Sequence, residues 1–198
     1  MKILNFGSLN VDHVYRVKQL PGPGETVTST GYHQFAGGKG FNQSIALARA
    51  GVRPVHAGMI GSDGGWLKNR LDSVGADTRW IQIAEGETGH AVIQVDDSGE
   101  NSIVIHGGAN RKITAETAHT VIAEFDKGDW LLLQNEISAI PAVLTAASNA
   151  GMNVAFNPAP MTEEVKAYPL DCVDLFVLNE TEATALSGKA NPESAATP

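Results

Sequence analysis

The chain has 198 residues, of which 42% are apolar and 18% charged, and its formal net charge at pH 7 is −8. This composition is typical of a globular protein with a sizeable core, built as one domain or as one domain with a small appendage. The acidic balance argues against nucleic acid or an anionic membrane as a partner, because binding to either needs clustered Lys and Arg.

Nothing in the sequence indicates export or insertion into a membrane. The single cysteine, Cys172, excludes an internal disulfide and fits a reducing compartment. The N-terminal apolar run is interrupted at Asn5 and is too short for a signal peptide, and no apolar run approaches the length of a membrane span. We therefore expect a cytoplasmic protein without a membrane partner.

Short apolar runs typical of buried strands recur along the chain. They cover residues 3–8, 55–60, 130–134, 153–156 and 175–178. Helical patterns lie between them, at residues 41–50, 66–74, 114–125, 138–150, 163–168 and 180–186. Thr114 and Ser138 are the expected N-caps of two of these helices. Apolar strands that alternate with helices predict an α/β fold with a mostly parallel sheet covered on both faces.

Three segments have a different, half-exposed pattern. Residues 25–35 alternate polar and β-favouring side chains, and residues 89–95 and 101–106 form a hairpin around a glycine-containing loop. Together they predict a small antiparallel sheet, partly separate from the main one. Residues 80–83 begin this change of pattern and are assigned to neither sheet.

The most informative stretch is a glycine-rich loop that runs into a helix ending at Gly51. It reads Ala36-Gly37-Gly38-Lys39-Gly40-Phe41-Asn42-Gln43. Glycines allow a ligand to approach the backbone, and the free N–H groups of the first helical turn would point at it. The Asn42 amide adds donors and an acceptor, which suits hydroxyls or phosphate oxygens. The structural alternative is a tight strand-to-helix connection without a ligand.

Two other glycine motifs do not fit this stretch. A phosphate-binding P-loop needs Ser or Thr after Gly-Lys, and here Gly40 follows Lys39. A dinucleotide fingerprint needs a third glycine where Gln43 stands, which disfavours a nicotinamide-dependent dehydrogenase.

Polar side chains also follow several predicted strands, where ligands of parallel α/β sheets bind. They are Asn10 and Asp12, Asn135 and Glu136, Asn157, and Asn179 with Glu182. Each of them taken alone could be a helix cap or a turn residue. The set is rich in carboxylates and amides and poor in Arg, which suits a neutral polyol.

The glycine motif, preceded by Asn10-x-Asp12, resembles the signature of the ribokinase family of sugar and nucleoside kinases. The residues at 107–110 and 179–183 resemble later motifs of that family, and the motif form is closer to its ribokinase branch than to adenosine or fructokinase relatives. The resemblance implies a doubly wound α/β/α domain with a β lid over the sugar, at about residues 13–35 and 89–106. The lid is often the dimer interface, so a homodimer is expected.

Carried over by position, the resemblance implies a set of substrate-binding residues: Asn10, Asp12, Gly37, Gly38, Lys39, Asn42 and Glu136. Asn179 and Glu182 would lie near the phosphates of ATP, with Glu182 reaching Mg²⁺ through water. Lys39 would be either a phosphate partner or a structural residue. His90 would face the sugar, or more simply pack or face solvent, and Phe41 would either narrow the pocket or fill core.

The family's Gly-Ala-Gly-Asp motif, which supplies the catalytic base, does not occur in these 198 residues, so none of them is assigned as catalytic. We interpret residues 1–198, which end in the polar stretch 191–198, as the N-terminal, sugar-binding portion of such a kinase without its C-terminal ATP part. The expected function is ATP-dependent phosphorylation of the primary hydroxyl of ribose or a related sugar. The alternatives are a non-catalytic sugar-binding or dimerising fragment, and a family kinase for another sugar or nucleoside.

Overall fold

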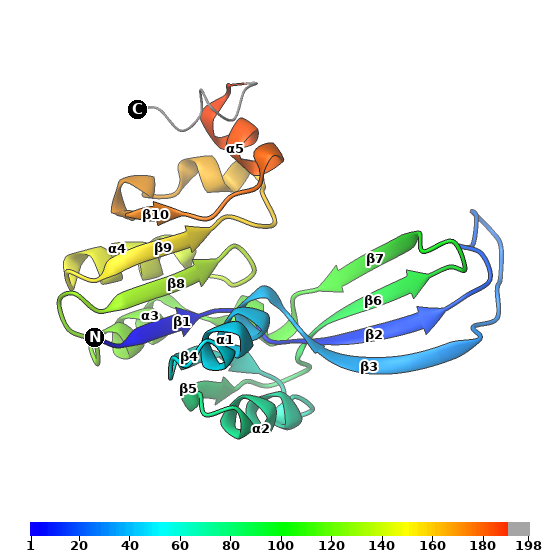
Figure 1. Ribbon diagram of the computed structural model, residues 1–198, viewed down its shortest axis with the longest axis horizontal. Helices are drawn as coiled ribbons and strands as arrows, with labels where there is room; N and C mark the ends of the chain where they lie inside the picture. The colour runs from blue at the N-terminus through cyan, green and yellow to red at the C-terminus, as the bar shows by residue number, and fades with distance from the viewer. Residues whose placement is uncertain (190–198) are drawn as a thin grey trace.

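A computed structural model describes residues 1–189, which form two sheets with helices around the larger one (Figure 1). The larger sheet has six parallel strands in the order β10-β9-β8-β1-β4-β5. Their bounds are Ile3–Phe6 (β1), Val55–Ile60 (β4), Asp77–Ile83 (β5), Trp130–Gln134 (β8), Asn153–Asn157 (β9) and Leu175–Phe176 (β10). The predicted fold class is confirmed.

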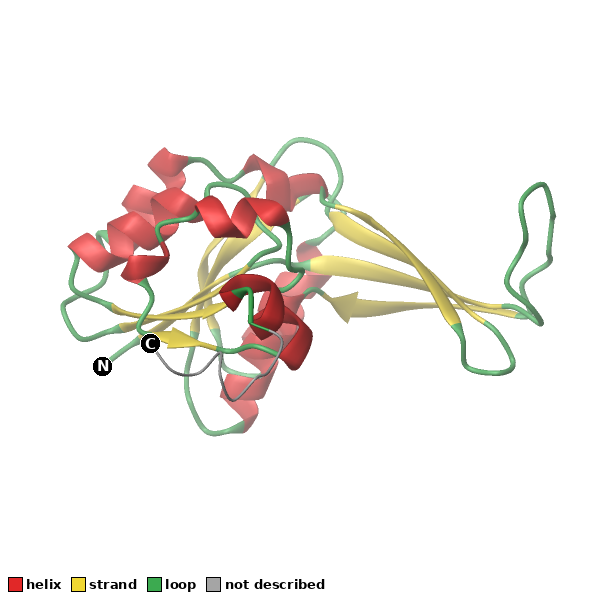
Figure 2. Ribbon diagram, turned by 90° about the horizontal axis from the view of Figure 1, so that it is seen from above, coloured by secondary structure: helices red, strands yellow, loops and turns green. Residues whose placement is uncertain are grey.

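Helices cover both faces of this sheet, as Figure 2 shows. They are α1 (Lys39–Arg49), α2 (Gly65–Ser73), α3 (Ala115–Ile122), α4 (Ile140–Asn149) and α5 (Glu180–Ser187), with 3-10 turns η1 (Gly108–Lys112), η2 (Glu163–Ala167) and η3 (Leu170–Cys172). One apolar cluster joins the sheet to α3 and α4, and a second joins it to α1 and α2. The core therefore lies on both sides of the sheet, as continuous apolar strands require.

The order of the strands reverses between β1 and β8. The chain passes from β1 outward to β4 and β5, and then returns to the other side of β1 to build β8, β9 and β10. In open parallel sheets, ligands bind beyond the carboxyl ends of the strands at such a reversal. The fold itself thus points to the carboxyl ends of β1 and β8.

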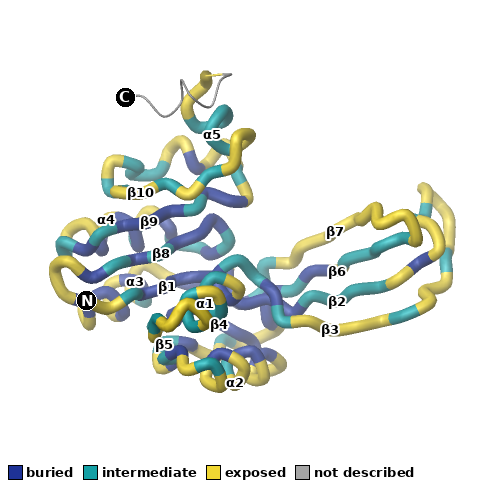
Figure 3. Tube along the Cα trace, viewed as in Figure 1, coloured by how far each residue is buried: buried dark blue, intermediate teal, exposed yellow. Residues whose placement is uncertain are grey.

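The second sheet projects from the main body, and we call it the lid. It comprises β2 (Asn10–Arg16), β3 (Gly31–Gly37), β6 (Gly89–Val95) and β7 (Asn101–His106) in the order β3-β2-β6-β7. The lid is mixed, and not purely antiparallel as expected, because β2 and β6 leave the main body in the same direction and pair in parallel. Figure 3 shows how exposed it is compared with the main sheet.

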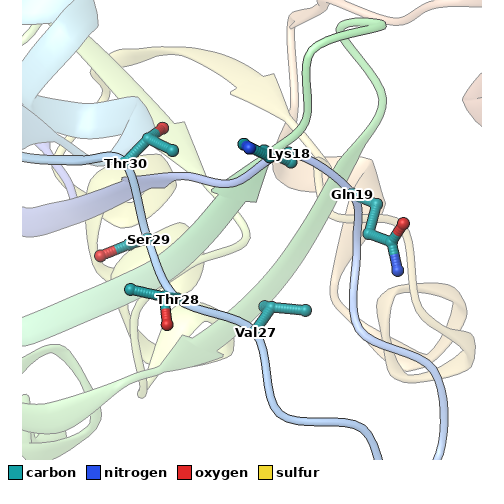
Figure 4. A pocket seen from close by; sticks show the side chains of 6 residues that line it. All are labelled: Lys18, Gln19, Val27, Thr28, Ser29 and Thr30. Atoms are coloured by element: carbon teal, nitrogen blue, oxygen red, sulfur yellow. The ribbon is translucent and has the colours of Figure 1, made fainter.

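The first part of the lid, predicted at about residues 13–35, has different bounds in the structure, where β2 begins at Asn10 and β3 ends at Gly37. Asn10 and Asp12 do not follow the first strand as a turn but belong to β2. Residues 25–30 are not strand, because β2 pairs only as far as Arg16 opposite Gly31 and leaves them without a partner. These residues form a loop at the tip, where Val27, with its neighbours 28–30, and Lys18 and Gln19 surround a hollow (Figure 4). No carboxylate is among these lining residues.

Elsewhere the differences are local. Residues 80–83 belong to β5, an edge strand of the main sheet, whose outward side chains break the apolar pattern. Ser138 is not the cap of α4: the helix follows Ala139, and the Ser138 hydroxyl donates to the carbonyl oxygen of Ile113 at 2.7 Å. Thr114 does cap α3, by accepting from the backbone N–H of Thr117. The predicted polar stretch 191–198 lies outside the described residues.

Candidate sugar site

The glycine loop is pressed against the end of β1. β3 ends at Gly37, α1 begins at Lys39, and Gly38 between them has φ 90°, a conformation that only glycine adopts readily. A Cβ at Gly40 would lie 2.5 Å from the backbone N of Ser8 and 2.6 Å from the Cα of Gly7. The absence of side chains therefore lets the start of α1 meet the turn after β1.

We call the place where the start of α1 meets the turn after β1 the corner. Glu136 lies in this corner, and three groups contact its carboxylate. The Ser8 hydroxyl donates to Oε2 at 2.6 Å and the backbone N–H of Lys39 donates to the same oxygen at 2.8 Å. The Lys39 ammonium lies 4.0 Å from Oε1. Because Lys39 is the first residue of α1, the carboxylate sits at a helix N-terminus, where the dipole stabilises negative charge. Within residues 1–189, Oε1 accepts no hydrogen bond and is available to a ligand.

Asp12 faces the same space from the lid. Its carboxyl group lies over Gly37, where a Cβ would overlap it. Partial burial raises the pKa of Asp12, and the nearby negative charge of Glu136 raises it further. Among the described residues, none donates a hydrogen bond to this carboxyl group. A half-buried acceptor without a donor is costly, and hydroxyl groups of a ligand would satisfy it.

Asn10 completes this side of the site. It is buried, and its Oδ1 accepts from Nδ2 of Asn110 at 2.7 Å, which leaves Nδ2 of Asn10 as a donor without a partner among residues 1–189. Asn110, in η1, also bonds both backbone groups of Leu9, at 3.1 and 3.2 Å. A side chain at Gly89 would overlap the two amides. Ser8 and Asn110 were not assigned as site residues from the sequence, although the motif at 107–110 pointed to the region.

The remaining predicted residues lie in different places around this corner. Asn42 is exposed and lines a groove between β3, α1 and α2 that also includes Phe35, the residue paired with Asp12. His90 lies on the lid face opposite Asp12, because Asp12 pairs with Ala91, and it packs 5.8 Å from the ring of His13. Phe41 is 3% exposed and fills the core beside α2.

Asn179 and Glu182 lie at the start of α5, apart from the corner. They form a capping box: Asn179 Oδ1 accepts from the N–H of Glu182 at 2.8 Å, and Glu182 Oε2 accepts from the N–H of Asn179 at 3.0 Å. No cluster of three or more acidic, His or Cys side chains within residues 1–189 is placed to hold a metal ion. Asn179 and Glu182 fit Mg²⁺ only through water, at Oε1 of Glu182, which the capping box does not use.

Two carboxylates, one amide donor and a helix N-terminus thus meet at the strand reversal of a doubly wound sheet, beneath a separate β lid. This arrangement is that of an α/β protein with acceptors and a donor, between the sheet edge and the lid, that suit the hydroxyl groups of a small molecule. The family model of the pfkB family carbohydrate kinases matches residues 1–197, and the chain belongs to that family.

Several of its relatives are ribokinases. The chain is 39% identical to ribokinase of Haemophilus influenzae, over 92% of this chain and 61% of the relative, and 36% identical to ribokinase of Staphylococcus aureus, over 94% and 63%. Among solved structures, ribokinase of Cryptococcus neoformans in complex with ADP is 40% identical with a TM-score of 0.80, over 93% of this chain and 60% of that one. Ribokinase of Arabidopsis thaliana complexed with ribose and ATP is 30% identical with a TM-score of 0.77, over 94% and 62%. The chain therefore spans about three fifths of the length of these relatives.

No helix of residues 1–189 is long and apolar enough to cross a membrane.

Proposed function

We propose that this chain provides the sugar-binding side of an ATP-dependent kinase that phosphorylates the primary hydroxyl of ribose or a related sugar. The observation that carries the proposal is the half-buried carboxyl group of Asp12, which accepts no hydrogen bond within residues 1–189 and lies near enough to Glu136 for that charge to raise its pKa. Two carboxylates can accept from neighbouring hydroxyls, while the Asn10 amide donates. The relatives named ribokinase, one of them solved with ribose and ATP, support ribose as the substrate.

The phosphoryl donor in this proposal is ATP with Mg²⁺. The metal would neutralise charge on the phosphates, and Glu182 would hold it through water while Asn179 keeps α5 capped. We expect transfer to require the further sequence that its relatives possess, since phosphoryl transfer depends on holding both reactants in line. By itself, this stretch would bind sugar. A cytoplasmic location, which the single Cys172 supports, belongs to the same proposal.

A coupled assay of ADP release tests this function. The 198-residue chain and a form extended to the length of its relatives would each receive ATP, Mg²⁺ and one of ribose, fructose or adenosine. We expect turnover with ribose in the extended form and at least 100-fold less in the shorter one, roughly the contribution of a general base. Equal turnover in both forms would place the base within these residues, and preference for fructose or adenosine would refute ribose as the substrate.

We also propose a homodimer formed through the lid face that carries Asp12. Ile103 and Ile105 lie on this face, because they pair with Ile93 and Ala91, and they are 51% and 61% exposed. Val92, in contrast, pairs with Val104 on the opposite face. Which residues of β6 and β7 share a face depends on the register between the two strands, and this register comes from the structure.

Replacing Ile103 and Ile105 with Lys should convert the dimer to monomer in sedimentation velocity, because two charges would be buried in the interface. Val104→Lys is the matched control on the reverse face and should leave the dimer intact. A parent protein that sediments as a monomer, or a monomer produced only by Val104→Lys, would contradict this interface.

A further inference from the structure

A network of buried polar side chains lies beneath the glycine loop, outside the residues that face the sugar. Its members come from β1, α1, β4 and β8, and all but Gln43 are fully buried: Asn5, Gln43, Ser44, His56 and Gln134. Buried polar groups are costly unless hydrogen-bonded, so a network in the core must do more than fill space.

The directions of the amide hydrogen bonds in the network follow from Asn5. Its Nδ2 donates to the carbonyl oxygen of Gly40 at 2.7 Å, and a carbonyl can only accept, so Oδ1 of Asn5 is the acceptor side. Nδ2 also donates to the Ser44 hydroxyl at 2.7 Å, and that hydroxyl in turn bonds Nδ1 of His56 at 2.8 Å. Burial lowers the pKa of His56 to about 4, so this ring is neutral at pH 7. The bond between Ser44 and His56 runs in the direction that the tautomer of this neutral ring sets.

Gln134 connects this network to α1. Its Nε2 donates to Oδ1 of Asn5 at 2.9 Å and to Oε1 of Gln43 at 2.6 Å. Its Oε1 is buried against Gly7, where any side chain would overlap it, and has no partner among the described residues. The amide is therefore enclosed at the junction of β1, β8 and the first turn of α1.

The position of this junction relates it to the sugar site. Gln134 ends β8, two residues before Glu136, while Gln43 lies one turn after Lys39, whose N–H bonds Glu136. One side chain thus joins the two segments whose contact orients the Glu136 carboxylate. If the segments moved apart, the hydrogen bond from Lys39 to Glu136 would lengthen.

We propose that Gln134 is a positioning residue for the sugar site, which keeps the end of β8 against the first turn of α1 and thereby holds Glu136 in place. Its relation to sugar rests on the function proposed above. Sites held within a fraction of an ångström need such support from residues that never touch the ligand. A purely structural Gln134 would affect the stability of the fold and leave the site unchanged.

The test uses two variants that remove the same bond from opposite ends. Gln134→Met removes both donors at similar volume, and Gln43→Met removes the α1 acceptor at a half-buried helix position that tolerates Met. We expect each to weaken ribose binding, measured by calorimetry, about tenfold, as for one lost hydrogen bond. The double variant should bind no more weakly than Gln134→Met, because both changes remove one shared interaction.

Two further measurements separate positioning from stability and from the proposed function. Leu144→Ala, in the distant core of α4, is the control: it should lower Tm while leaving ribose affinity within twofold. Hydrogen exchange of the Lys39 amide, which needs no sugar, should be faster in Gln134→Met and Gln43→Met than in Leu144→Ala. Unchanged Lys39 exchange in both Met variants would overturn the positioning role. A parent protein that does not bind ribose would refute the proposed function, and the exchange result would still decide this inference.

Discussion

Replacing Asp12 with Asn is expected to weaken ribose binding about 10- to 100-fold, the range for hydrogen bonds to a charged group. Asn keeps the shape of the side chain but offers one acceptor oxygen in place of two and loses the charge. The ligand-free protein should be no less stable than the parent, because the Asp12 carboxylate is half-buried near Glu136 and has no donor in the described part of the chain. Calorimetry and thermal unfolding measure the two effects. A fall in Tm with unchanged ribose affinity would make Asp12 a structural residue.

The pH dependence follows from the same carboxyl group. The pKa of Asp12 is raised above its ordinary 3.8, so the folded state holds this proton more tightly than the unfolded state does. Ionisation of Asp12 therefore costs stability as pH rises, while ribose affinity should fall as pH drops through the raised pKa. In Glu136→Gln the repulsive charge is gone, so any remaining affinity should persist to lower pH. The opposite shift would contradict the proximity of the two groups.

Gly40→Ala should be the most damaging of the possible single-methyl additions to the loop. The new Cβ would meet backbone atoms of Gly7 and Ser8 at 2.5 to 2.6 Å, and backbone cannot turn aside as a side chain can. We expect a loss of about 3 kcal/mol in the free energy of unfolding, the upper part of the usual range for overpacking, together with loss of ribose binding.

Gly65→Ala is the matched control for this substitution. Gly65 is the first residue of α2, and a Cβ there would have no neighbour within 4 Å. Because Ala favours helix over Gly, this variant should be neutral or slightly more stable in urea denaturation. Equal stability of the Gly40 and Gly65 variants would mean that the contact between the loop and β1 is not close.

The main sheet was predictable because its central strands are buried on both faces. β8 and β9 have continuous apolar runs that need no knowledge of their neighbours. β5 lacks such a run, since Arg79 and Gln82 point to solvent at the sheet edge. The lid required non-local information, because the parallel pairing of β2 with β6 depends on where both strands leave the main body.

The candidate-site residues that belong to a sequence motif could be predicted, whereas the placement of residues that depends on packing could not. The glycine loop, Asp12 and Glu136 followed from the sequence, but the side of α1 on which Asn42 lies depends on how the helix is rotated against α2. Asn179 and Glu182 have the spacing of a capping box as well as that of a motif, so sequence could not distinguish the two. Gln134 looked like the polar end of a strand, and only the fold shows its partners.

The most direct test of the sugar site is a calorimetric titration of ribose into the 198-residue chain, its Glu136→Ala variant and Gly65→Ala. We predict saturable binding with one ribose per chain for the parent and for Gly65→Ala, and affinity at least tenfold lower for Glu136→Ala, since hydrogen bonds to a charged acceptor are lost. No saturable binding by the parent, or the same affinity in Glu136→Ala, would contradict a sugar site between Asp12 and Glu136.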